Sequence, residues 1–302
     1  MTAVLRPSRL PEIELRAPST VGELATLVGQ GYCAYAGGTD LILEAALTGE
    51  PRRVASTAGV EELRRIEVHP DGIRVGASVT LAQLIGEGSV RAAIPAVTDG
   101  ARVIGSVQLR NTATLVGNVC TASPAGDTIP GLFVHRARVE TADASGTVRS
   151  VPVGEFATGP GETVLADDEV VTAVSIESLG LGAGSAYRRF TERRAIDLAF
   201  ASVAARVVLD PDGETVRDIG LALGAVGPTV IDAAGAAEPL RGLTISDVRL
   251  QAVGEAAVWL CSPISDHRCS ADYRRHLVRV LIAETIYEAA ARARAAYEDP
   301  GP

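Results

Sequence analysis

The sequence predicts an α+β fold, because paired strand-type runs and helical stretches occupy separate parts of the chain. The strand-type runs flank turn sequences rich in Asp and Gly, and apolar residues at helical spacing dominate residues 273–297. The 302 residues correspond to roughly two domains at ~100–200 residues each. With 47% hydrophobic and 22% charged residues, the composition is that of a globular protein.

The first part of the chain predicts two helices and a strand. Thr20 and Glu23 have the spacing of a capping box, so we expect a helix to begin there and to end at the glycines of residues 29–31. Residues 32–35 are of strand type, and residues 41–47 have an apolar helical pattern.

Three later segments have the pattern of β-hairpins. They span residues 66–75, 139–151 and 203–223, with turns at 69–72, 143–146 and 210–213. A second capping box, Thr80 with Gln83, predicts a helix after the first hairpin, and residues 168–176 are a further candidate strand.

Two segments are irregular. Residues 111–127 carry almost no charge and many Gly, Thr, Ser and Asn residues, so we expect a loop system that exposes backbone groups. Residues 180–184, with three glycines, are a candidate joint between domains. Their spacing also resembles a dinucleotide fingerprint, but a flexible linker is favoured because no acidic residue follows ~20 positions on within a βαβ unit.

Composition excludes several functions. A formal charge of −9 and a pI near 5.1 disfavour unspecific binding to nucleic acids or anionic membranes. No apolar run reaches the ~18–20 residues of a membrane span, and the first twenty residues contain no apolar stretch typical of a secretory signal. We therefore expect a cytoplasmic protein without a nucleic-acid partner.

The basic residues are all arginine, because none of the 28 is lysine. P-loop NTPases, pyridoxal-phosphate enzymes and protein kinases each need a lysine and are excluded. The four cysteines and four histidines are scattered, so their spacing predicts no metal site and no Ser–His–Asp arrangement.

Two glycine-bearing segments form the candidate site. Paired glycines allow φ > 0 and let backbone N–H groups approach an anion without a Cβ in the way. If the two segments converge, they can hold a diphosphate, and a stretch beginning at Ser123 lies nearby. The segments are Ala36, Gly37, Gly38, Thr39 and Asp40, and Thr114, Leu115, Val116, Gly117 and Asn118.

These motifs resemble the FAD-binding medium subunits of molybdenum hydroxylases, the xanthine dehydrogenase and carbon monoxide dehydrogenase type. In that family the first loop reads close to A-G-G-T-D, and the second close to T-I-G-G-N followed by S-P-x-x-D. Residues 104–111, 185–190, 193–199 and 272–277 are also similar to family segments, so the likeness covers most of the chain in order.

The resemblance implies a two-lobed FAD-binding domain of the PCMH type at residues 1–178, with lobes at about 1–58 and 59–178. A smaller C-terminal domain, residues 185–298, would carry helices on a three-stranded sheet.

For the site, the resemblance implies that residues 36–40 and 114–118 hold the FAD diphosphate. Ser123 and Asp127 would lie beside the ribityl and adenosine portions, and Ile104 would line the slot. Val171 would touch the flavin, with a shift of one residue left open, and Arg189 would lie near the isoalloxazine. No residue of this chain would be catalytic.

The chain departs from the family pattern at two of these positions. Val116 replaces a glycine, so the backbone is either strained there or simply tolerates valine. Arg189 replaces a lysine, which keeps the charge that favours an anionic reduced flavin but changes the donor geometry, or only reflects the general arginine bias.

The implied function is electron transfer. Substrate would be oxidised at a molybdopterin cofactor on a large partner subunit, and electrons would cross iron–sulfur (2Fe-2S) clusters on a small partner to FAD on this chain. The assembly would be a dimer of heterotrimers. The alternatives are a stand-alone FAD-dependent oxidoreductase of the same fold and a degenerate scaffold that binds no flavin.

Overall fold

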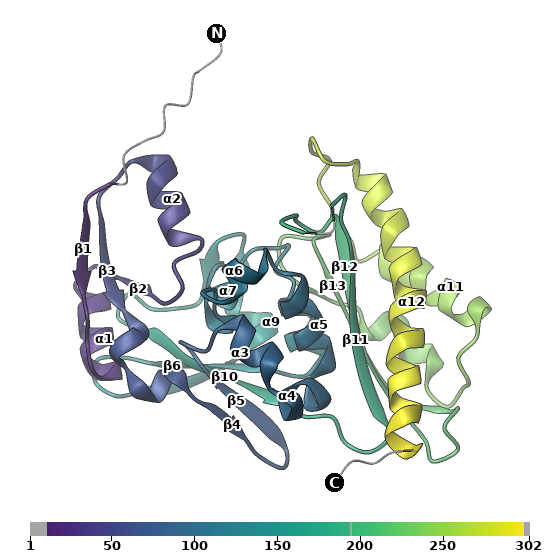
Figure 1. Ribbon diagram of the computed structural model, residues 1–302. Helices are drawn as coiled ribbons and strands as arrows, with labels where there is room; N and C mark the ends of the chain where they lie inside the picture. The colour runs from purple at the N-terminus through teal and green to yellow at the C-terminus, as the bar shows by residue number, and fades with distance from the viewer. Residues whose placement is uncertain (1–10, 194, 299–302) are drawn as a thin grey trace.

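The computed structural model describes residues 11–193 and 195–298, and Figure 1 shows three sheets following one another across the molecule. Of the sequence features above, the first ten residues and Arg194 lie outside the described part.

The first sheet is a small parallel unit. Its strand order is β1-β3-β2, and the strands are β1 (Ile13–Arg16), β2 (Cys33–Tyr35) and β3 (Arg52–Ser56). Helices α1 (Val21–Gly29) and α2 (Leu41–Thr48) connect them, as predicted. Thr20 caps α1, and the Glu23 carboxylate accepts from the N–H of Ser19 at 2.8 Å. Strand and helix therefore alternate here, unlike in the hairpins that follow.

The second sheet is antiparallel, in the order β4-β5-β10-β6-β7. The hairpins β4–β5 and β6–β7 and the strand β10 confirm the sequence predictions. Side chains alternate between the two faces of each strand, and Val75, Val139 and Val174, from three neighbouring strands, belong to one hydrophobic core. The strands are β4 (Ile66–Val68), β5 (Gly72–Gly76), β6 (Arg138–Ala142), β7 (Val148–Pro152) and β10 (Val170–Glu177).

Short helices fill the chain between β5 and β6. Thr80 and Gln83 form the predicted reciprocal capping box, in which the Thr80 N–H donates to the Gln83 side chain at 2.9 Å. The helices are α3 (Leu81–Gly86), α4 (Gly88–Ala93), α5 (Pro95–Val103), α6 (Val107–Arg110), α7 (Leu115–Cys120) and α8 (Ile129–Val134). Smaller elements flank this sheet: η1 (Thr57–Gly59), η2 (Glu61–Arg64), α9 (Val153–Phe156), β8 (Ala157–Gly159) and β9 (Glu162–Thr163).

Helix α7 corrects the expectation that residues 111–127 are loop throughout. The Thr114 hydroxyl accepts from the N–H of Gly117 at 2.9 Å and caps the helix. The side chains of Leu115, Val116 and Val119 are buried in the hydrophobic core that also contains Val75 and Val139. Burial of one apolar face outweighs a composition that is poor for helix.

The third sheet has three long antiparallel strands, as the resemblance implied, and one two-residue strand at its edge. The strands are β11 (Ala183–Phe190), β12 (Ala201–Leu209), β13 (Val216–Gly224) and β14 (Ile231–Asp232). The predicted C-terminal helix is α12 (Ala271–Glu298), and the others are α10 (Ala234–Ala237), η3 (Glu238–Leu240) and α11 (Asp247–Val258).

Both faces of this third sheet are covered. Helix α12 packs on one face, while α5 and α8 pack on the other, where Ala96, Val134, Tyr187 and Ala204 form a small shared core (Figure 1). Every residue of β12 except Arg206 is buried, which reflects this double coverage. The face covered by α5 and α8 therefore packs against the part of the chain that carries the candidate site.

Two of the three glycines in residues 180–184 pack against α12, whereas an added Cβ at Gly180 would meet nothing within 4 Å. Gly182 has a φ of +69°, and β11 begins at Ala183. At Gly184 an added Cβ would overlap the backbone of α12 at Ala289. Because a strand follows these glycines instead of a helix, they form no dinucleotide fingerprint.

Candidate functional site

The first glycine loop, residues 36–40, connects β2 to α2. Gly38 has a φ of +66°, and an added Cβ would overlap the ring of Tyr35. At Gly37 an added Cβ would overlap the carbonyl oxygen of Thr112, which precedes the second segment. The first loop therefore touches the residues just before the second segment, at a position where only glycine fits.

The backbone N–H groups of this loop are free. Within residues 11–193 and 195–298, the N–H groups of Gly37, Gly38, Thr39 and Asp40 donate to no protein acceptor. Asp40 does not cap α2 with its side chain; its carboxylate accepts from the Thr121 hydroxyl at 3.1 Å. Four consecutive free donors are the arrangement that binds an anion.

The second segment, residues 114–118, is the first turn of α7. Val116 is helical and 5% exposed, and it is absent from the residues with positive φ, so the backbone tolerates valine at this position. Asn118 accepts from the Thr128 hydroxyl through its side-chain oxygen at 2.6 Å. Leu115 and Val116 are buried, and the N–H of Leu115 donates to the carbonyl of Val79 at 3.4 Å.

The segment at residues 121–128 completes this group. Ser123 closes a turn, accepting from the N–H of Ala125 at 3.3 Å. Gly126 lies beside Asn118, where an added Cβ would come within 3.6 Å of the side-chain oxygen. The structure thus brings residues 36–40, residues 114–118 and Ser123 together, in agreement with the sequence-based grouping.

Asp127 and Arg189 contact each other. The guanidinium donates to the Asp127 carboxylate at 2.5 Å and to the carbonyls of Val103 and Asp197 at 2.9 and 3.2 Å. The Tyr187 hydroxyl donates to the other carboxylate oxygen at 2.6 Å.

Burial raises the pKa of the Asp127 carboxyl above its usual range, with Arg189 and Tyr187 opposing the shift. Burial also raises the pKa of the Tyr187 phenol well above its usual range, and Asp127 adds to this.

Tyr187 is the member of this network that sequence reasoning missed. A signal was present, because Tyr187 and Arg189 are two residues apart on β11 and so share one face of the strand.

The two remaining predicted residues lie at the edges of this region. Ile104 follows α5, is half-buried, and its carbonyl accepts from Arg110 at 2.8 Å. Val171 lies in β10, which packs against α7, and is only 7% exposed. The contacts of both residues with a flavin stay predictions.

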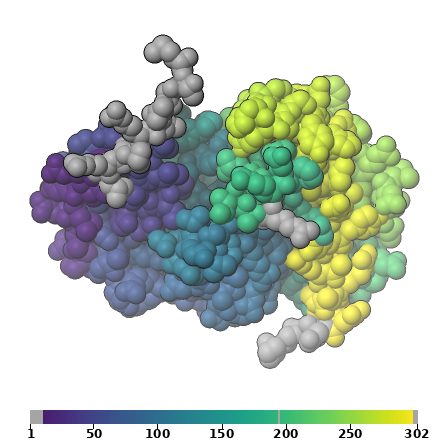
Figure 2. All heavy atoms as spheres, turned by 45° about the horizontal axis from the view of Figure 1, so that its top comes forward, coloured from purple at the N-terminus to yellow at the C-terminus, as the bar shows by residue number. Residues whose placement is uncertain are grey.

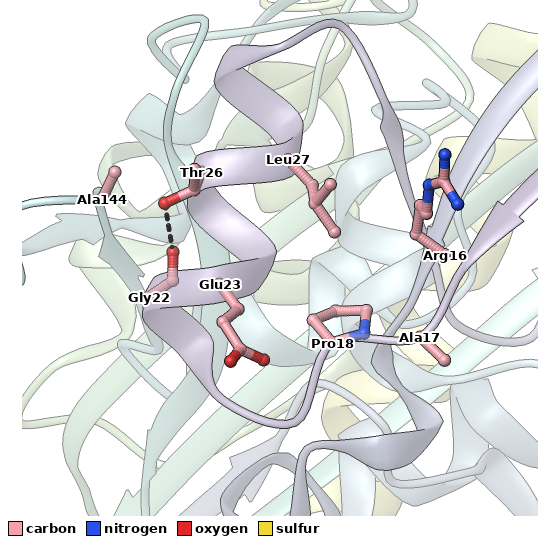
Figure 3. Close-up of a pocket in the computed structure, with 8 residues that line it drawn as sticks. All are labelled: Arg16, Ala17, Pro18, Gly22, Glu23, Thr26, Leu27 and Ala144. Carbon is pink, nitrogen blue, oxygen red and sulfur yellow. Dashed lines mark hydrogen bonds between the residues drawn. The ribbon is translucent and has the colours of Figure 1, made fainter.

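Two cavities in the described part of the chain lie away from these loops. One, of about 560 Å³, lies between β1 and α1 and is lined by Arg16, Pro18 and Glu23 among others (Figure 3). The other, of about 570 Å³, lies between α8 and β13 and is lined in part by Arg136, Arg206 and Asp218. Neither cavity is lined by residues 36–40 or 114–118.

The described residues contain neither a group of metal ligands nor a helix that could span a membrane. Among them, no group of three or more His, Cys, Asp and Glu side chains is placed to hold a metal ion. In the same part of the chain, no helix has the length and apolar character needed to cross a membrane.

Comparisons with known proteins agree with this architecture. Residues 11–177 match the family model of the FAD-binding domain in molybdopterin dehydrogenase, and residues 185–289 match that of the CO dehydrogenase flavoprotein C-terminal domain. The nicotine 6-hydroxylase medium subunit of Paenarthrobacter nicotinovorans is 32% identical, over 94% of this chain and 99% of its own. The carbon monoxide dehydrogenase medium chain of Hydrogenophaga pseudoflava is 30% identical, over 93% of this chain and 98% of its own.

Solved structures show the same relationship. Carbon monoxide dehydrogenase from Hydrogenophaga pseudoflava, in a form lacking the Mo-pyranopterin moiety, superposes with a TM-score of 0.88 at 28% identity, covering 94% of this chain and 99% of that one. Quinoline 2-oxidoreductase from Pseudomonas putida 86 also gives a TM-score of 0.88, at 25% identity and with 95% and 99% coverage. The chain therefore belongs to the family of FAD-binding medium subunits of molybdenum hydroxylases.

Proposed function

We propose that this chain is the FAD-binding electron-transfer subunit of a multi-subunit molybdenum hydroxylase, with the FAD diphosphate held by residues 36–40 and 114–118. The observation that carries the proposal is the row of four free backbone N–H groups at Gly37, Gly38, Thr39 and Asp40. Two of these positions lack a Cβ, so the backbone can approach the phosphates closely.

The residues present fit this cofactor. The diphosphate is an anion that needs several donors, and the first loop supplies them next to the start of α7. Bound FAD would supply the redox chemistry, accepting and releasing electrons. The residues of this chain bind and orient it: the loops hold the diphosphate, while Ser123 and Asp127 would lie beside the ribityl and adenosine portions. Ile104, Val171 and Arg189 would lie along the slot, the last near the isoalloxazine.

The partners follow from the division of labour in the family. The relatives are medium subunits, and the described residues of this chain contain no cluster of metal ligands. We propose that a large molybdopterin-binding subunit oxidises the substrate and that a small subunit with 2Fe-2S clusters delivers the electrons. The assembly would be a dimer of heterotrimers.

We also propose the domain division at residues 1–178, with lobes at about 1–58 and 59–178, and at residues 185–298. The two family models, matching 11–177 and 185–289, support this division. A cytoplasmic location is supported by the four cysteines, which form no disulfide.

Purification of the single chain and of the co-expressed complex tests the function. We expect the single chain to be yellow and to release FAD on denaturation. We expect the three-subunit complex to reduce this flavin anaerobically when an N-heteroaromatic or aldehyde donor is added, whereas the single chain does not.

Two outcomes would contradict the proposal. A chain that takes up no FAD after reconstitution would be a degenerate scaffold. A single chain that oxidises the organic donor with dioxygen or NAD(P)⁺ at the rate of the complex would be a stand-alone oxidoreductase.

A further inference from the structure

We propose that the C-terminal domain completes the cofactor site, with Tyr187 as a positioning residue that fixes residues 123–128 through Asp127. This inference rests on the proposed function, because it concerns how the same FAD site is held. It assigns Tyr187 a role that neither glycine loop has: it touches no free backbone donor and acts through a neighbouring segment.

The first observation is the burial of the network. The side chains of Asp127 and Arg189 are 7% and 6% exposed, and Tyr187 is 6% exposed. Both Asp127 oxygens are bonded to residues of β11, one to Tyr187 and one to Arg189. A buried carboxylate has no water to replace a lost partner, so each of these bonds constrains where the Asp127 backbone lies.

The second observation is that the C-terminal domain holds the same segment at another point. The Pro124 carbonyl accepts from the N–H of Ala225 at 2.8 Å. Ala225 has a φ of +62°, a conformation that disfavours residues with a Cβ. Gly224 lies against Pro130, where an added Cβ would come within 2.9 Å of the proline ring. The end of β13 thus supports this segment from a second side.

The third observation is the link from this segment to the cofactor loops. The Thr128 hydroxyl donates to Asn118 at 2.6 Å, and Gly126 lies beside the same Asn118 side chain. On the other side, an added Cβ at Gly100 would overlap the Asp127 carbonyl oxygen, so the segment is also pressed against α5. A shift of Asp127 would therefore displace Asn118 through its two chain neighbours, Gly126 and Thr128.

Loss of the Tyr187 hydroxyl leaves one oxygen of a buried carboxylate without its partner while the ring still fills its space. Asp127 then keeps Arg189 but is less fixed, and the segment it belongs to moves relative to Asn118. The consequence is weaker and less ordered FAD binding, which a purely structural link between the domains would not produce.

The experiment compares Tyr187→Phe with Glu177→Gln in the full-length chain. Glu177 also joins the domains, accepting from Arg206 at 2.9 Å, but it lies at the end of β10 beside the second cavity and outside the candidate site. Free FAD is titrated into each apoprotein, and the dissociation constant, the visible circular dichroism of the bound flavin and the thermal midpoint of the apoprotein are measured.

We expect Tyr187→Phe to raise the FAD dissociation constant at least about tenfold, which corresponds to ~1.4 kcal/mol, and to change the flavin circular dichroism. Glu177→Gln should lower the thermal midpoint but leave the affinity and the spectrum unchanged. Thr128→Val, which cuts the link to Asn118, should weaken binding similarly, and the double variant should lose less than the product of the single effects. Thr128→Val alone provides the test if Tyr187→Phe does not fold.

A Tyr187→Phe protein that binds FAD with wild-type affinity and spectrum would overturn the inference while leaving the proposed function intact. Equal losses of FAD affinity in Tyr187→Phe and Glu177→Gln would also overturn the inference, because the network would then only hold the two domains together. A wild-type chain that takes up no FAD would instead overturn the proposed function.

Discussion

Neighbouring glycines in the cofactor loop are required for different physical reasons. Gly37 has no room for a Cβ because the carbonyl oxygen of Thr112 occupies that place. Gly38 adopts a φ of +66° and also faces the ring of Tyr35. The sequence pattern predicts that both glycines allow positive φ and a close approach of the backbone to an anion, but only the folded chain shows that Gly37 is required by a close approach and Gly38 by its conformation.

Gly38→Ala tests the role of this loop, with Gly49→Ala as its matched control. Gly49 has a φ of +71° and nothing within 4 Å of an added Cβ. Each substitution should destabilise the fold by about 1 kcal/mol through its left-handed backbone. Only Gly38→Ala should also raise the FAD dissociation constant, because its Cβ would displace the loop from Tyr35. Equal affinities in a flavin titration of the two variants would remove residues 36–40 from the site.

At the level of elements, local signals were predictable and long-range packing was not. The capping box at Thr80 and the hairpin of β6 and β7 depend on residues close in sequence, and both were predicted correctly. Helix α7 was missed because its stability comes from burying Leu115 and Val119 against distant strands. The parallel order of the first sheet was missed for the same reason.

The glycines of residues 180–184 show the same limit. Their spacing predicts a linker, but in the folded chain Gly184 lies under the backbone of α12. This approach depends on a helix about a hundred residues later, so nothing in the local sequence reveals it.

Gly184→Ala should therefore destabilise the packing of α12 on the third sheet. Its Cβ would overlap the Ala289 carbonyl oxygen and the Ala293 nitrogen, which are backbone atoms and cannot rotate away. We expect the free energy of unfolding to fall by about 1–3 kcal/mol, as for other overpacked sites. Gly180→Ala is the control, because an added Cβ there meets nothing within 4 Å. Urea unfolding of the two variants measures the difference, and equal midpoints would contradict this account.

For the whole molecule, the sequence predicted the loops of the site but not the way the domains share it. Asp127 and Arg189 were each assigned to the flavin from motif positions, yet they are 62 residues apart and bonded to each other. Pairing between residues of different domains depends on how α5 and α8 pack on the third sheet, and no local pattern encodes that packing. The missing element of the site was therefore its C-terminal support.

A second buried junction between the domains involves His135. Its ring is fully buried and donates through Nδ1 to the Glu177 carbonyl at 2.8 Å, since a carbonyl can only accept. Nε2 then accepts from the Ser185 hydroxyl at 2.8 Å, and Ser185 accepts from the N–H of Ala96 at 3.0 Å. This chain of bonds joins α8, β10, β11 and α5, and burial of the ring favours the neutral imidazole.

Burial lowers the pKa of His135 from 6.5 to about 4, so the folded protein should lose stability as the pH falls between these values. The unfolded chain takes up a proton near pH 6.5 while the folded chain stays neutral, which favours unfolding by about 3 kcal/mol at most. Full stability is therefore expected above pH 6.5.

Glu169 and Asp266, whose pKa values are lowered to about 2, reduce the stability only below about pH 4.5. Asp127 has a raised pKa, so its contribution to stability has the opposite sign. Of the groups that lose stability on acidification, His135 acts between pH 6.5 and 4.5, above the range of Glu169 and Asp266. Urea unfolding across this pH range should show a falling free energy in the wild type and in His69→Gln, an exposed control, but a flatter profile in His135→Gln. A His135→Gln protein that keeps the full wild-type slope would show that another group senses the pH.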